Sequence, residues 1–74
     1  MANHVYAREG ELLTKRESDI LKLVSKGLTY TEIAAELHWP YYTIRDDAQC
    51  VLKKLGVRSR HHAVAVAYEK KLLP

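Results

Sequence analysis

Residues 40–57, PYYTIRDDAQCVLKKLGV, are the stretch around which the rest of the chain is organised. Apolar side chains recur there every three or four residues, the period of one face of an α-helix; they are Ile44, Ala48, Val51, Leu52 and Leu55. The opposite face is polar and carries Tyr42, Asp46, Gln49 and Lys53, with Arg45 at its edge. A second helical segment, TYTEIAAEL at residues 29–37, precedes it across the short junction 38–40. Two helices joined so closely, the second with a long polar face, predict a helix-turn-helix motif.

Capping signals divide the rest of the chain into helices. A threonine followed three residues later by a glutamate marks a helix start, and this pattern occurs at Thr14 with Glu17 and at Thr29 with Glu32. A glycine followed by an apolar residue is typical of a helix end, and this pattern occurs at Gly27 and Gly56. We predict helices over about 15–26, 30–37, from Pro40 to 56, and 60–71 with Ser59 as its cap. No alternating β-branched run is present, so the predicted fold is all-α: a four-helix (tetrahelical) helix-turn-helix domain.

The chain has 74 residues, enough for one small domain. We assign residues 1–12 to an N-terminal extension, whose mixed sequence is compatible with disorder, and residues 13–74 to the helical domain. Trp39 is expected to plug the core between the second and third helices. Cys50 is the single cysteine, so an internal disulfide is excluded and a reducing cytosol is the simplest location. No apolar run approaches the roughly 18 residues of a membrane span, so we expect a cytoplasmic protein without a membrane partner.

The formal net charge is +3, and the basic excess lies in the second half of the chain. Such a patch suits a polyanion, although a solvated surface with mild excess charge explains the same composition.

The fourth predicted helix has a centre, residues 63–68, that is apolar on nearly every side. One face is expected to pack on the first helix, and the other would be exposed in a monomer. An exposed apolar face of small side chains favours pairing of two copies about a two-fold axis. The predicted dimer interface consists of Ala63, Val64, Ala67, Tyr68 and Lys71. The alternative is a helix buried deeply within its own domain.

The polar face of the third helix carries residue types that read base edges in a major groove. Arginine bridges guanine O6 and N7, glutamine pairs with adenine N6 and N7, and aspartate accepts from cytosine N4. The candidate base contacts are Arg45, Asp46 and Gln49. Hydroxyls, ammonium groups and the N-terminus of the second helix suit phosphates; the candidates are Thr29, Thr31, Tyr42, Lys53 and Lys54, with Tyr41 and Tyr42 also able to touch a thymine methyl.

A solvated helix face is the competing interpretation of these polar residues. Asp46 and Asp47 favour it, because carboxylates repel phosphate unless a base or an internal ion pair occupies them; they also suit a helix N-terminus electrostatically. No metal or cofactor is expected, since the histidines and Cys50 form no recognised ligand spacing. An enzyme is not expected either, because no acid–base pair or activated nucleophile is set up.

Five motifs between Leu13 and Leu73 resemble the DNA-binding domain of LuxR/FixJ/GerE-type bacterial transcription regulators: LTKRE, GLTYTEIA, TIR, KKLGV-x-x-R and AV. The resemblance implies four helices, with the third in the major groove and the fourth forming a dimer. It implies base contacts by Arg45, Asp46 and Gln49, and backbone contacts by Thr31, Thr43 and Lys54. Arg60 matches a family arginine that mainly braces the fold.

This chain differs from the family pattern at several positions. Pro40 stands where serine or threonine is usual, and Thr31 stands where lysine is common. Asp46 replaces a basic or polar residue, and Asp47 a frequent histidine. These changes remove positive charge, phosphate donors or the usual helix cap, so the resemblance implies fewer phosphate contacts than usual and weaker binding at moderate salt.

The leading hypothesis is a small bacterial transcription regulator that binds duplex DNA as a dimer at the nucleoid. The residues before the first motif are too few for a sensor, so the chain is either a free-standing regulator or an excised C-terminal domain. The alternative is a protein-interaction module or decoy that pairs with a full-length regulator or RNA polymerase.

Overall fold

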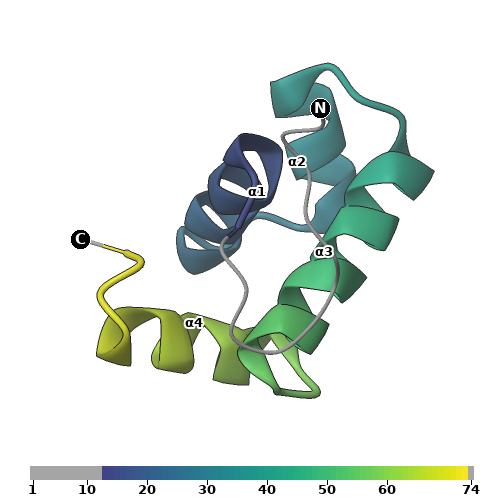
Figure 1. Ribbon diagram of the computed structural model, residues 1–74. Helices are drawn as coiled ribbons and strands as arrows, with labels where there is room; N and C mark the ends of the chain where they lie inside the picture. Colours follow the sequence, from purple (N-terminus) through teal and green to yellow (C-terminus); the bar gives the residue numbers. More distant parts are fainter. Residues whose placement is uncertain (1–12, 74) are drawn as a thin grey trace.

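The computed structural model describes residues 13–73, which form four α-helices and no strand. The helices are α1 (Lys15–Ser25), α2 (Tyr30–Leu37), α3 (Tyr41–Leu55) and α4 (Arg60–Glu69). The predicted all-α, four-helix class is confirmed (Figure 1). The N-terminal extension predicted over residues 1–12 lies outside the described residues. None of the four helices is long and apolar enough to cross a membrane.

The first two helices begin with the capping boxes expected from the sequence. The Thr14 hydroxyl accepts from the Glu17 backbone N–H at 3.1 Å, and the Glu17 carboxylate accepts from the Thr14 N–H at 2.9 Å. Thr29 and Glu32 repeat this exchange at 3.2 and 2.8 Å. Because each box satisfies two N–H groups that the first turn leaves unpaired, these starts are encoded locally.

The helix ends expected at the two glycines are also confirmed. Gly27 and Gly56 have φ values of 94° and 70°, a region that costs glycine little. The N–H of Leu28 then reaches the carbonyl of Leu23 at 3.2 Å, which completes a Schellman motif. The same bond joins Val57 to Leu52 after α3.

The end of α2 at Leu37 is where the sequence predicted it, but the positive backbone φ values at His38 and Lys71, after α2 and α4, were not predicted. His38 ends α2 with a φ of 60°, and Lys71 follows α4 with a φ of 61°. α4 stops at Glu69, two residues before the expected end, and the N–H of Leu72 turns back to the carbonyl of Ala67 at 2.8 Å. This turn brings Leu73 into the core.

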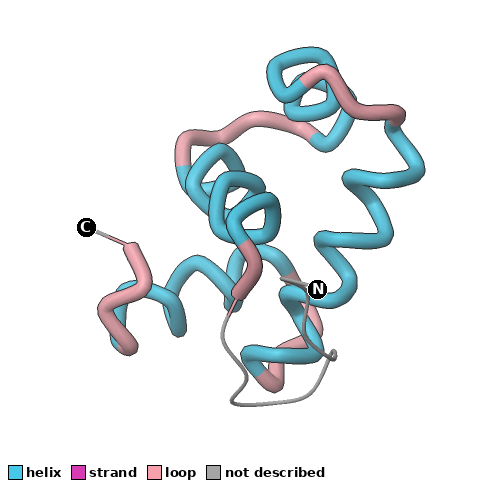
Figure 2. Tube along the Cα trace, turned by 45° about the horizontal axis from the view of Figure 1, so that its top comes forward, coloured by secondary structure: helices cyan, strands magenta, loops and turns pink. Residues whose placement is uncertain are grey.

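α3 is the helix on which the domain is assembled. It packs against α1, α2 and α4, which all lie on one side of it in both views (Figures 1 and 2). One core cluster joins α1, α2 and the first half of α3: Ile20, Ile33, Ala34, Ile44 and Ala48. The other joins α1, the second half of α3, α4 and the chain end: Leu21, Val51, Leu52, Leu55, Ala63, Ala67 and Leu73. The other three described helices therefore leave the far side of α3 uncovered.

The structure corrects two expectations about packing. Ala63 and Ala67 were predicted at a dimer interface, but they are 1% and 0% exposed in the core of their own domain. Their small side chains allow α4 to lie close to α1 and α3, so the buried-helix alternative holds for this face. Trp39 was expected to plug the core, but it is 45% exposed, because the left-handed turn at His38 carries it to the surface.

Candidate nucleic-acid interface

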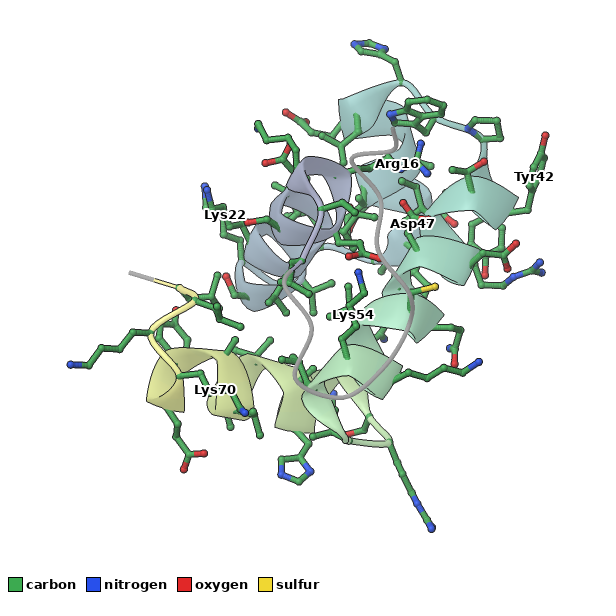
Figure 3. The ribbon with its side chains drawn as sticks, in the orientation of Figure 1. Arg16, Lys22, Tyr42, Asp47, Lys54 and Lys70 are labelled. Carbon is green, nitrogen blue, oxygen red and sulfur yellow. The ribbon has the colours of Figure 1, made fainter. Side chains whose placement is uncertain are left out.

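The uncovered side of α3 carries five exposed polar residues, which we call the reading face: Tyr42, Arg45, Asp46, Gln49 and Lys53. Spacings of three, four and seven residues bring them onto one stripe of the helix. Tyr42 is 61% exposed and points away from the body of the domain (Figure 3). All three predicted base contacts thus lie on a free surface, where a ligand can reach them.

Arg45 and Asp46 form an ion pair on the reading face. Nε and Nη2 of Arg45 donate to Oδ1 of Asp46 at 3.2 and 3.1 Å. The two side chains are 51% and 66% exposed. Because an exposed pair contributes only about 0–1 kcal/mol, either partner can exchange it for a ligand at small cost.

Asp47 turns away from the reading face and joins a cluster that we call the Arg16 clamp, made of Arg16, Trp39 and Asp47. Nε of Arg16 donates to Oδ2 of Asp47 from the neighbouring helix α1. The guanidinium of Arg16 also lies over the Trp39 ring, 4.3 Å from its centroid. The clamp therefore ties α1, the α2–α3 turn and α3 together. The internal ion pair that sequence reasoning named as one fate of the aspartates is present at Asp47.

Lys54 was predicted to contact phosphate, and the structure contradicts this. Its side chain and that of Glu17 are both 0% exposed, and Nζ of Lys54 donates to Oε1 of Glu17 at 2.6 Å. An ammonium enclosed between α1 and α3 cannot reach a phosphate. A signal for this pair existed in the sequence, since Glu17 falls on the same helical stripe as Ile20, Leu21 and Val24.

The other phosphate candidates differ in exposure. Thr29, Thr31 and Lys53 are exposed, and Thr43 is half-buried on the flank of α3. The Thr29 oxygen accepts from the Glu32 N–H, and its hydroxyl proton is the group that could donate to a phosphate.

The rest of the predicted dimer surface also varies in exposure. Tyr68 is 50% exposed, Lys71 is exposed, and Val64 is half-buried.

Arg60 lies 5.1 Å from the centroid of the Tyr30 ring and so links α4 to α2. This contact agrees with the bracing role that the resemblance implied for Arg60.

Cys50 is half-buried beside the clamp. Burial raises the pKa of its thiol, and the carboxylates of Glu17 and Asp47 raise that pKa further. Since the thiolate is the nucleophilic form, this environment makes Cys50 less reactive than an ordinary cysteine.

A sequence model of the family described as "Bacterial regulatory proteins, luxR family" matches residues 11–67. The chain belongs to the luxR family. This luxR-family chain is 38% identical over 63 residues to the response regulator protein VraR of Staphylococcus aureus. It matches VraR of Staphylococcus saprophyticus equally well. Each match covers 85% of this chain and 30% of the relative, so the chain spans less than a third of the length of these curated relatives.

A solved structure supports the same assignment. The response regulator ChrA of a heme-sensing two-component system superposes with a TM-score of 0.82 at 30% sequence identity, over 85% of this chain and 31% of that protein. The expected family and the helix-turn-helix fold are thereby confirmed.

Proposed function

We propose that this luxR-family chain is a transcription regulator that binds double-stranded DNA by placing the reading face of α3 in the major groove. The observation that carries the proposal is the stripe of α3 that the three supporting helices leave uncovered. Its polar residues are exposed, and Tyr42 projects away from the body of the domain (Figure 3). A helix needs such a free stripe to reach base edges, because the groove admits little more than one helix. Chromosomal DNA as the partner would place the protein in the cytoplasm, at the nucleoid.

Base reading is assigned to Arg45, Asp46 and Gln49. Arg45 would bridge guanine, Gln49 adenine, and Asp46 would accept from cytosine N4. Arg45 and Asp46 already form an ion pair with each other, so each would have to share or exchange that contact to meet a base. Separating such an exposed pair is inexpensive, so its presence does not oppose binding.

Phosphate contacts are assigned to exposed or half-buried donors near α3: Thr29, Thr31, Tyr42, Thr43 and Lys53. Lys54 is removed from the set by its burial. With few ammonium groups in this set, the affinity should be modest and should fall with salt less steeply than that of a protein with many phosphate contacts.

A homodimer through α4 is part of the proposal, with a smaller interface than the sequence suggested. Ala63 and Ala67 no longer belong to it, which leaves Val64, Tyr68 and Lys71. Exposure of the Tyr68 ring supports a contact there, since large exposed aromatic side chains are enriched at interfaces.

A gel-shift titration with random-sequence duplex at low and moderate salt tests DNA binding. We expect retardation at low salt that weakens as salt rises; no retardation at low salt would reject the proposal. Selection of bound sequences from a random duplex pool then tests the dimer, because a two-fold protein selects a palindrome.

The second candidate function is a protein-interaction module that pairs with a related regulator or RNA polymerase. The observation in its favour is the exposed aromatic group at the start of α3, where Trp39, Tyr41 and Tyr42 are 45%, 48% and 61% exposed. Aromatic side chains are typical anchors of protein interfaces. Absence of DNA binding would favour this function.

A further inference from the structure

Asp47 places a carboxylate on the flank of α3 where a DNA strand would pass. It lies four residues after Thr43, so the two side chains are neighbours on the helix surface. Thr43 is one of the proposed phosphate contacts. An unpaired negative charge beside it would repel the phosphate that Thr43 is to hold.

The Asp47 carboxylate is not unpaired, because Arg16 holds it from the neighbouring helix α1. Its Nε donates to the carboxylate, and the side chains of Arg16 and Asp47 are 35% and 14% exposed. The pair on the reading face, Arg45 with Asp46, is 51% and 66% exposed. The Arg16–Asp47 pair is thus the more withdrawn from solvent, so salt and water screen it less.

The guanidinium of Arg16 is itself fixed by a second contact. It lies over the Trp39 ring at 4.3 Å from the centroid, within the range of a cation–π interaction. Arg16 therefore has one partner on α3 and one on the turn that leads into α3. Figure 3 shows Arg16 and Asp47 lying toward each other between α1 and α3.

We propose that Arg16 is a positioning residue for DNA binding: it neutralises Asp47 and retains its carboxylate between α1 and α3, so that the flank of α3 can approach a phosphate. The inference rests on the proposed function and extends it to a residue outside the reading helix. It explains how an α3 with two adjacent aspartates can face DNA, since Asp46 stays exposed in its pair with Arg45 on the reading face and Asp47 is masked.

The test compares R16Q, D47N and the double variant R16Q/D47N with the wild-type chain by fluorescence anisotropy on a random-sequence duplex over a range of salt. We expect R16Q to bind roughly three- to tenfold more weakly at low salt, because a bare carboxylate then faces the phosphate. The difference should shrink as salt rises. D47N should bind at least as tightly as wild type, and the double variant should recover wild-type affinity.

Lys22→Gln is the matched control. It removes the same charge from the same helix, but Lys22 is exposed and points away from α3 (Figure 3). We expect this variant to bind DNA as tightly as wild type does. That result would show that weaker binding by R16Q comes from the unmasked Asp47 carboxylate and not from the loss of one positive charge. Circular dichroism on each variant checks the fold; should R16Q not fold, D47N decides, and weaker binding by D47N would overturn the inference.

The remaining outcomes are also decisive. R16Q with wild-type affinity would overturn the inference and leave the proposed function standing. A double variant as weak as R16Q would mean that Arg16 itself holds phosphate, which also overturns masking. A wild-type chain that does not bind duplex DNA would remove the proposed function and this inference with it.

Discussion

Replacing Lys54 with methionine is expected to destabilise the domain by about 3–5 kcal/mol, the usual cost of leaving one partner of a buried ion pair alone. Glu17 is 0% exposed and would lose the 2.6 Å bond from the Lys54 ammonium. Within the described part of the chain, its Oε1 would keep the bond from the Thr14 N–H at 2.9 Å. Among residues 13–73, its Oε2 has no hydrogen-bond partner. The variant thus leaves a nearly unsolvated carboxylate in the core.

This loss is large for so small a protein. Typical stabilities of about 0.05–0.15 kcal/mol per residue give a chain of this size roughly 4–11 kcal/mol in total. A loss of 3 kcal/mol corresponds to a fall in Tm of about 12–24 °C. Urea and thermal unfolding followed by circular dichroism measure both quantities.

The double variant E17Q/K54M tests whether the cost of K54M comes from the unpaired negative charge of Glu17. Its neutral glutamine can still accept from the Thr14 N–H, and neither buried charge of residues 13–73 remains, so we expect a stability within about 2 kcal/mol of wild type. The reasoning would be refuted if K54M cost less than about 1 kcal/mol, a value typical of exposed pairs. It would also be refuted if the double variant were no more stable than K54M.

Three further predictions concern the reading face, a helix end and the thiol. Arg45→Ala should weaken specific DNA binding by roughly 1–3 kcal/mol in a gel-shift titration against the selected site; unchanged specific binding would remove Arg45 from the base contacts. Gly27→Ala should lower the free energy of unfolding by about 1–2 kcal/mol, because alanine is strained at the φ of +94°. An added Cβ meets nothing within 4 Å, so no steric clash contributes to this cost. An unchanged urea midpoint would contradict the backbone strain. Cys50 should react with iodoacetamide more slowly in the folded chain than in urea, because burial raises the pKa of its thiol. Equal alkylation rates in the two states would contradict this prediction. The raised pKa also stabilises the folded state at pH values below the pKa of the unfolded thiol, and this stabilisation is lost as pH rises through the pKa of the folded thiol.

Helix boundaries were largely predictable, since their causes are local. A capping box or a glycine-hydrophobe end involves groups within five residues of one another, so Thr14 and Gly56 reveal them in any context. The end of α2 at Leu37 was predicted, but the left-handed turn at His38 was not. The end of α4 was placed two residues too late, because lysine rarely takes the positive φ that Lys71 has. There the surrounding packing overrides local preference.

The candidate site was only partly predictable for a related reason. Helical periodicity separates an inner from an outer stripe of α3, and it placed Arg45 and Gln49 outside. Lys54 was misplaced, because a lysine near a helix end usually faces water and the glutamate that buries it lies 37 residues earlier. The Arg16 clamp was missed because its members come from α1, the turn and α3.

Sequence alone was enough to identify the four helices, the family and the exposed stripe, because these depend on capping chemistry and on a periodicity of a few residues. Three-dimensional packing settled which charges are available at that stripe. Asp46 stays at the surface, whereas Asp47 and Lys54 are taken up by Arg16 and Glu17 of α1. The reason is physical: a charge is exposed or masked according to what lies within a few ångströms of it, and such neighbours come from distant parts of the chain.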